Sequence, residues 1–260
     1  MHWLGLLRRH PAFARMWLAE AISLAGDWFS LVAISVLAVR EGGGQGALAV
    51  AATLAAHDLP MGLMRPLAGV LADRFDRRNL LVGVHLGQAA LTALMVNRAV
   101  HADVAALQVL VLLRSMLGGL DWPARAGALR RVVPPEDLVA ANAFSGATWS
   151  ASYAIGMALG GLVSSFGVPL ALAVDTGSFL IGAALLATLP AMPTRGSTGT
   201  VREAALQAAT DLREAWALAR SSPALLRAVL SKTPLGLAGG AAVVMLNVAA
   251  DRTAFAGTAA

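Results

Sequence analysis

The chain has 260 residues, of which 57% are hydrophobic and only 13% are charged, and its mean hydropathy is +0.67. Soluble domains average about a quarter charged residues, so most of this surface must face something other than water. The absence of cysteine excludes a disulfide framework and a thiolate metal site. The formal net charge of +5 comes from arginines between apolar segments rather than from a basic face with interleaved aromatic residues, so the charge does not indicate nucleic-acid binding.

Seven segments are long enough to cross a bilayer, which takes about 20 apolar residues. They are apolar nearly all round, whereas helices of soluble bundles carry a polar stripe. The N-terminal arginines precede an apolar run too long for a signal peptide, so the first segment should remain as a membrane helix. The sequence therefore predicts an all-α membrane protein with spans at residues 13–39, 46–72, 80–100, 104–120, 138–164, 169–189 and 225–249.

Arginines gather in every second connection between these spans. The other connections hold only Arg40 and Arg98. The arginine-rich connections hold Arg8, Arg9, Arg15, Arg74, Arg77, Arg78, Arg125, Arg130, Arg131 and Arg195. Because positively charged loops stay on the cytoplasmic side, we predict a multi-pass protein of the cell membrane with a cytoplasmic N-terminus.

A polar linker separates the sixth and seventh spans. Thr200 and Glu203 form a capping-box pattern that opens a helix over residues 201–220. One face of this helix is apolar, so we expect it to lie along the inner membrane surface. The predicted organisation is a transmembrane bundle at 1–189, a cytoplasmic linker at 190–222 and a further transmembrane helix at 223–260.

The connection after the second span reads Gly69-Val-Leu-Ala-Asp73-Arg74-Phe-Asp-Arg77-Arg78. It resembles the loop signature of the major facilitator superfamily of secondary transporters, Gly-x-x-x-Asp-Arg-x-Gly-Arg-Arg, with Asp76 at the usual position of Gly. Residues 114–118 resemble the Arg-x-x-x-Gly element of the superfamily. Further stretches resemble its macrolide- and siderophore-exporter-like branch, at residues 23–29, 123–125, 133–137, 141–143 and 175–179. The segment Gly156-Met157-Ala-Leu-Gly160-Gly161 is similar to the antiporter signature Gly-Pro-x-x-Gly-Gly, with Met157 in place of Pro.

This resemblance implies the six-helix N-terminal bundle of a twelve-helix transporter, followed by the first helix of an incomplete C-terminal bundle. Inverted three-helix repeats are a property of that fold. Five helices of the layout would then lie beyond the 260 residues. Either the chain is a fragment or truncated product, or it assembles with a partner or a second copy.

Asp27 and Arg114 are the strongest candidates for coupling or substrate contact. Asp27 lies about 14 residues, roughly 21 Å, into the first span, and Arg114 about 11 residues into the fourth, so both reach the middle of the membrane. Charges there cost about 3 kcal/mol each and usually face the bundle interior. An acid and a base at one depth can pair, and protonating the acid breaks the pair, as a proton-coupled exporter requires. The alternative is a purely structural ion pair.

His57 and Asp58 lie near the middle of the second span, just before Pro60. Histidine titrates near neutral pH, so this pair is a candidate for a proton path. The alternative is that both residues only line an aqueous cavity.

The signature loop is a candidate gate, formed by Gly69, Asp73, Arg74, Arg77, Arg78 and Asp121. The resemblance implies that Asp73 latches the first bundle to a helix of the second, and Arg77 is a candidate partner for Asp121. A charged cluster that forms in only one conformation would gate alternating access. The alternative is that the arginines only fix topology.

The glycines at Gly156, Gly160 and Gly161 are predicted to let helices approach closely. A flexible or leak-sealing interface is the alternative role.

No enzyme, metal or cofactor site is predicted. The five histidines have no metal-ligand spacing, and no glycine-rich loop follows a strand to hold phosphate. We therefore interpret the chain as part of a secondary active transporter that exports an amphipathic small molecule in exchange for protons. The alternative is a non-transporting truncated product or a membrane scaffold that binds partner helices.

Overall fold

The computed structural model describes residues 3–193, together with residues 210, 213–214, 216–218, 220–227, 230 and 245. Every regular element in residues 3–193 is a helix, which confirms the all-α prediction. The elements are α1 (Trp3–Arg9), α2 (Pro11–Gly42), α3 (Gly46–Arg74), α4 (Arg77–Val100), α5 (Val104–Val132), α6 (Leu138–Ser165) and α7 (Val168–Ala187), with short 3-10 helices at Gly43–Gln45 and Pro135–Asp137.

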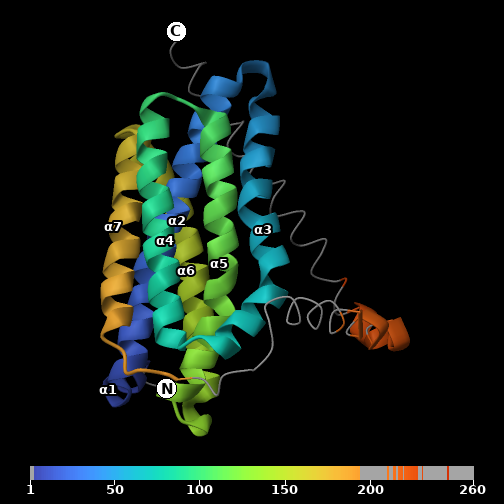
Figure 1. Ribbon diagram of the computed structural model, residues 1–260. Coiled ribbons are helices and arrows are strands. Elements are labelled where there is room, and N and C mark those ends of the chain that lie inside the picture. Colours follow the sequence, from blue (N-terminus) through green and yellow to red (C-terminus); the bar gives the residue numbers. More distant parts are fainter. Residues whose placement is uncertain are drawn as a thin grey trace.

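The six long helices, α2 to α7, form one bundle, and the short α1 lies at the end where α2 begins (Figure 1). The first six predicted spans each fall on one of these helices. Helical stretches of the described residues that are long and apolar enough to cross a membrane are Pro11–Met64, which includes α2 and most of α3, Arg77–Val100, Val104–Val132 and Val168–Ala187. The predicted surface helix at 201–220 and the seventh span at 225–249 fall for the most part outside the described residues.

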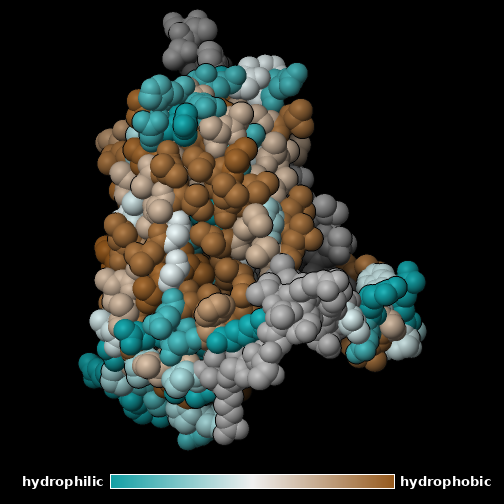
Figure 2. All heavy atoms as spheres, in the orientation of Figure 1, coloured by the Kyte–Doolittle hydropathy of each residue, from teal (hydrophilic) through white to brown (hydrophobic). Residues whose placement is uncertain are grey.

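The outside of the bundle has an apolar belt. Figure 2 shows polar residues at both ends of the visible face and a broad hydrophobic band between them. Large apolar side chains are exposed on several helices, including Leu63, Leu94, Leu113, Ile155 and Leu180. Soluble monomers rarely expose so much contiguous apolar surface, so the belt is suited to lipid.

The most extensive helix contacts follow a two-fold pattern. α2 packs against α6 and α7, α5 packs correspondingly against α3 and α4, and α4 packs against α7. Exchanging α2 with α5, α3 with α6 and α4 with α7 leaves this set of contacts unchanged. This is the arrangement of two inverted three-helix repeats. The repeats were not evident as a strong internal repeat in the sequence.

Two apolar clusters fill the bundle at different depths. One includes Phe13, Leu81 and Leu186 near the start of α2, and the other includes Ile34 and Leu172 nearer its end. Asp27, Arg114 and Asp175, described in the next subsection, lie between these two layers. Their position matters because apolar packing on both sides raises the cost of leaving one of these charges unpaired.

The fourth predicted span is too short, and the placement of Arg125 in a connection is wrong. α5 continues through Pro123 to Val132, so Arg125 lies on a helix. The extension is stable because Ala124 and Ala128 are buried in the first apolar cluster. The charge of Arg125 is met by Asp121, one helical turn earlier.

The connection between α5 and α6 is tied to the start of α2. His10 donates to Asp137 at 2.8 Å, and Arg9 lies 3.2 Å from the same carboxylate. The hydrogen bond from His10, with the charge of Arg9, holds the pKa of Asp137 below its usual range. The contact therefore contributes stability at neutral pH that is lost as the pH falls through this lowered pKa.

The signature loop is mostly helical, because α3 ends at Arg74 and α4 begins at Arg77. Only Phe75 and Asp76 connect them. Asp76 caps α4 by accepting from the backbone N–H of Asn79 at 3.2 Å, and its other oxygen accepts from the N–H of Met192 at 2.7 Å. The N–H of Arg77 donates to the carbonyl of Met192 at 3.4 Å. Asp76, the residue that departs from the usual Gly, therefore fastens the segment after α7 to this turn.

Replacing Asp76 with alanine should destabilise the bundle more than replacing Asp103 with alanine. Both aspartates cap a helix, an interaction worth about 1 kcal/mol, but Asp76 also holds Met192, which adds about another 1 kcal/mol. Thermal unfolding of the two variants in detergent measures the difference. The second hydrogen bond would contribute nothing if both variants lost the same stability and the Met192 amide stayed protected from hydrogen exchange in the Asp76 variant.

Candidate functional site

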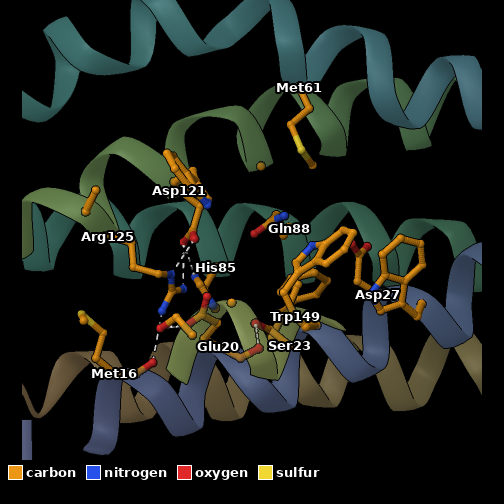
Figure 3. Close-up of a pocket in the computed structure, with 18 of the residues that line it drawn as sticks. Met16, Glu20, Ser23, Asp27, Met61, His85, Gln88, Asp121, Arg125 and Trp149 are labelled. Atoms are coloured by element: carbon orange, nitrogen blue, oxygen red, sulfur yellow. Dashed lines mark hydrogen bonds and ion pairs between the residues drawn. The ribbon is translucent and has the colours of Figure 1, made fainter. Parts of the chain in front are cut away.

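A cavity of about 560 Å³ lies inside the bundle and is lined by residues from all six long helices. This volume is within the usual range for sites that hold a small organic molecule, about 300–1,000 Å³. Figure 3 shows Asp121, Arg125 and Glu20 grouped toward one end of the cavity and Asp27 and Trp149 toward the other. The cavity thus contains two separate groups of charged side chains.

The first charged group is centred on Arg114 of α5, whose side chain is only 1% exposed. One guanidinium nitrogen lies 2.6 Å from the carboxylate of Asp27 on α2, and another donates to Asp175 on α7 at 2.7 Å and to the hydroxyl of Ser30 at 3.1 Å. The structure therefore brings Asp27 and Arg114 together at one depth. Breaking such a buried pair by removing one partner typically costs about 3–5 kcal/mol.

Asp175 belongs to a stretch that resembles the family but was not predicted as a site residue, although it completes the group. Its side chain is fully buried, whereas that of Asp27 is 20% exposed. A carboxylate inside an apolar span was the available signal, because such residues usually face the bundle interior and find a partner there. The three residues form one ion network in which a single guanidinium serves two carboxylates.

His57 connects this network to the open cavity. One imidazole nitrogen lies 3.5 Å from Asp27, and the other lies 2.9 Å from Asp58. The side chain of Asp58 is 75% exposed, whereas that of His57 is 8% exposed. The series from Asp58 through His57 to Asp27 therefore runs from the cavity surface to the buried arginine. α3 remains one continuous helix through Pro60.

The second charged group is centred on Arg125 of α5. Its Nε and one terminal nitrogen donate to Asp121 at 2.9 and 3.2 Å, and the other terminal nitrogen donates to the carbonyl of Met16 at 3.1 Å. His85 lies 3.7 Å from Asp121. Across the cavity, Glu20 accepts from the hydroxyl of Ser145 on α6 at 3.2 Å.

Asp121 therefore belongs to the cavity rather than to the signature loop. Its carboxylate is bound by Arg125, whereas the guanidinium of Arg77 lies against Gly127 of α5. Arg78 lies beside Arg77 in the first turn of α4, and Asp73 and Arg74 lie in the last turn of α3. A β-carbon on Gly69 would meet no atom within 4 Å among the described residues.

Glycines set the spacing between α2 and its neighbours. A β-carbon on Gly156 would clash with Trp28, and one on Gly160 would lie 2.7 Å from Val32, so α6 packs directly on α2 at both positions. The surroundings of Gly161 lie outside the described side chains. On the other side of α2, Gly26 packs against Ser178 and Asp175 of α7, a close contact that the sequence did not single out.

Aromatic side chains form one wall of the cavity. Trp149 stacks on Tyr153 with ring centroids 5.7 Å apart and an interplanar angle of 7°. Trp28 meets Tyr153 edge-on at 4.7 Å and Trp149 at 6.1 Å, and its ring lies 6.3 Å from that of His57. This cluster was also not identified from the sequence, because its members come from α2, α3 and α6 and meet only in the folded bundle.

Comparison with known proteins agrees with this arrangement. Residues 6–260 match the family described as transmembrane secretion effector, a branch of the major facilitator superfamily. The uncharacterized MFS-type transporter YfiS of Bacillus subtilis is 28% identical over 230 residues, which cover 87% of this chain and 53% of that protein.

Two further relatives carry functional names. Macrolide efflux protein A of Streptococcus pyogenes is 28% identical over 155 residues, or 59% of this chain and 38% of that protein. The enterobactin exporter EntS of Citrobacter koseri is 28% identical over 197 residues, or 73% of this chain and 46% of that protein. The chain spans about half or less of the length of these relatives.

Proposed function

Because the chain belongs to the transmembrane secretion effector family of the major facilitator superfamily, we propose that it provides one half of a proton-coupled exporter of an amphipathic small molecule. As a member of this family it is a multi-pass membrane transporter protein rather than a soluble one. The efflux-type names of two relatives support export, and the size and mixed lining of the cavity support a small organic cargo.

The observation that carries proton coupling is the sharing of Arg114 between two carboxylates. When Asp27 takes up a proton, Arg114 keeps the fully buried Asp175 as its partner, so no charge is left unpaired. Asp27 is also the carboxylate that His57 and Asp58 link to the cavity. We therefore assign Asp27, which the cavity reaches through His57, as the exchangeable partner, and the fully buried Asp175 as the fixed one.

The export cycle also needs a gate and a second bundle. We place the arginine-rich end, where α3, α5 and α7 finish, on the cytoplasmic side, as the positive-inside rule indicates. The cluster of Gly69, Asp73, Arg74, Arg77 and Arg78 then lies at the inner mouth, where it would close against a second bundle. Relatives about twice as long as the matched region support such a bundle, whether another part of the same polypeptide or a separate chain supplies it.

Replacing Asp27 with asparagine should abolish proton-driven transport while leaving the protein folded. Asparagine keeps the shape and one acceptor for Arg114 but cannot carry a proton between its ionised and neutral forms. The measurement is accumulation of neutral, cationic and anionic amphipathic dyes in everted membrane vesicles from cells that express the chain in its natural genomic context, with and without a protonophore.

The matched control is Asp103→Asn, which changes a carboxylate at the far end of the bundle. We expect the control to accumulate at least one dye in a protonophore-sensitive manner. Protonophore-sensitive accumulation that persists in the Asp27 variant would show that coupling resides elsewhere. If the unsubstituted chain accumulates no dye, it is a scaffold or an inactive product rather than an exporter.

A further inference from the structure

The ionisable side chains of the cavity are unbalanced in charge. Its lining holds the carboxylates of Glu20, Asp27, Asp58 and Asp121, and Arg125 is the guanidinium among the described lining residues. Behind this lining, Arg114 and Asp175 add one group of each sign. Carboxylates therefore outnumber cations even if both cavity imidazoles, His57 and His85, carry a proton.

The two arginines are already occupied. Arg114 is shared by Asp27 and Asp175, and Arg125 directs its nitrogens at Asp121 and at the carbonyl of Met16. Arg114 is only 1% exposed, and all three nitrogens of Arg125 are directed at its partners, so neither guanidinium is readily available to a further anion. Among the described residues of the cavity, an anionic cargo would therefore meet carboxylates without an uncommitted guanidinium to bind it.

Glu20 makes no direct ion pair among the described residues, although the charge of Arg125 is near enough to act on it. Within the described chain, its side chain accepts one hydrogen bond, from Ser145. Ser145 and Trp149 are four residues apart on α6, so they lie on one helix face about 6 Å from each other. The indole of Trp149 is half exposed and is held by stacking on Tyr153. Glu20 and Trp149 thus line different parts of one cavity, with Ser145 of α6 between them, so a molecule that fills the cavity can reach both the negative charge and the aromatic face.

We propose that the cargo is an organic cation with an apolar body, which places its charge beside Glu20 and packs its body against Trp149. This inference rests on the proposed function, because it names the chemical class that the exporter carries. The positive group gains from the charge of the carboxylate, and an apolar or aromatic body gains from packing against the indole face. The cavity volume of about 560 Å³ accommodates a drug-sized molecule of this kind.

The test uses two probes of nearly equal size and opposite charge, tetraphenylphosphonium and tetraphenylborate. Equilibrium dialysis of the purified chain in detergent, corrected for empty micelles, measures the affinity of each. We expect the phosphonium to bind at least about tenfold more tightly than the borate, and Glu20→Gln and Trp149→Leu each to weaken phosphonium binding about tenfold. Glu41→Gln, at an exposed carboxylate near the end of α2, is the control and should leave binding unchanged.

Equal or tighter binding of the borate would overturn the inference, and so would a phosphonium affinity that Glu20→Gln leaves unchanged. The vesicle experiment separates this outcome from failure of the proposed function. Protonophore-sensitive accumulation of the anionic dye alone would support the proposed export function and contradict a cationic cargo. Specific phosphonium binding without protonophore-sensitive accumulation would support the cation site and contradict the proposed export function.

Discussion

Replacing Arg114 with methionine should destabilise the bundle by about 3–5 kcal/mol, because it removes the guanidinium that two buried carboxylates share. Asp175 is fully buried and Asp27 is 20% exposed, so water cannot compensate for the loss at both positions. For a chain of this size the thermal midpoint should fall by about 10 °C. Thermal unfolding in detergent, followed by intrinsic fluorescence, measures the shift.

Two further variants show whether charge is the cause. Arg40→Met removes an exposed arginine near the end of α2 and should change stability by less than about 0.5 kcal/mol. Adding Asp175→Asn to Arg114→Met should recover part of the lost stability, because it removes one of the two carboxylates left without Arg114. If the double variant is no more stable than the single one, lost packing rather than an unpaired carboxylate explains the effect.

The long helices were predictable because their signal is local. Each apolar run of α2 to α7 carries enough hydrophobicity to define a span without knowledge of its neighbours. The end of α5 was missed because Arg125 resembles a loop residue in sequence, whereas in the fold its charge is met by Asp121 and by a backbone carbonyl of α2. A charged residue can therefore continue a helix where tertiary contacts satisfy it.

The pairing of Asp27 with Arg114 was predictable from depth alone, since two opposite charges in the hydrocarbon region have few other partners. The partners of the second charged group were not predictable in the same way. Glu20 meets Ser145, and Arg125 meets Met16, only because α2 packs against α5 and α6 in the bundle. The aromatic wall likewise depends on helix rotation, which composition and hydrophobicity do not specify.

The same dependence on close packing makes Gly26 the most sensitive small residue next to the ion network. A β-carbon at this position would lie 2.6 Å from a carboxylate oxygen of Asp175 and 2.9 Å from the β-carbon of Ser178. Gly26→Val should therefore push α7 away from α2 and move Asp175 off Arg114. Overpacking of this kind costs about 1–3 kcal/mol, and partial loss of the buried ion pair adds to it.

We expect Gly26→Val to lower the thermal midpoint in detergent by about as much as Arg114→Met. Gly83→Val is the matched control, because a β-carbon on Gly83 of α4 meets no atom of the described chain within 4 Å. Both substitutions add the same side chain to a helix, so their difference isolates the contact with α7. If Gly26→Val unfolds at the same temperature as Gly83→Val, α2 and α7 are not in close contact at the level of Asp175, and the ion network must be held by α2 and α5 alone.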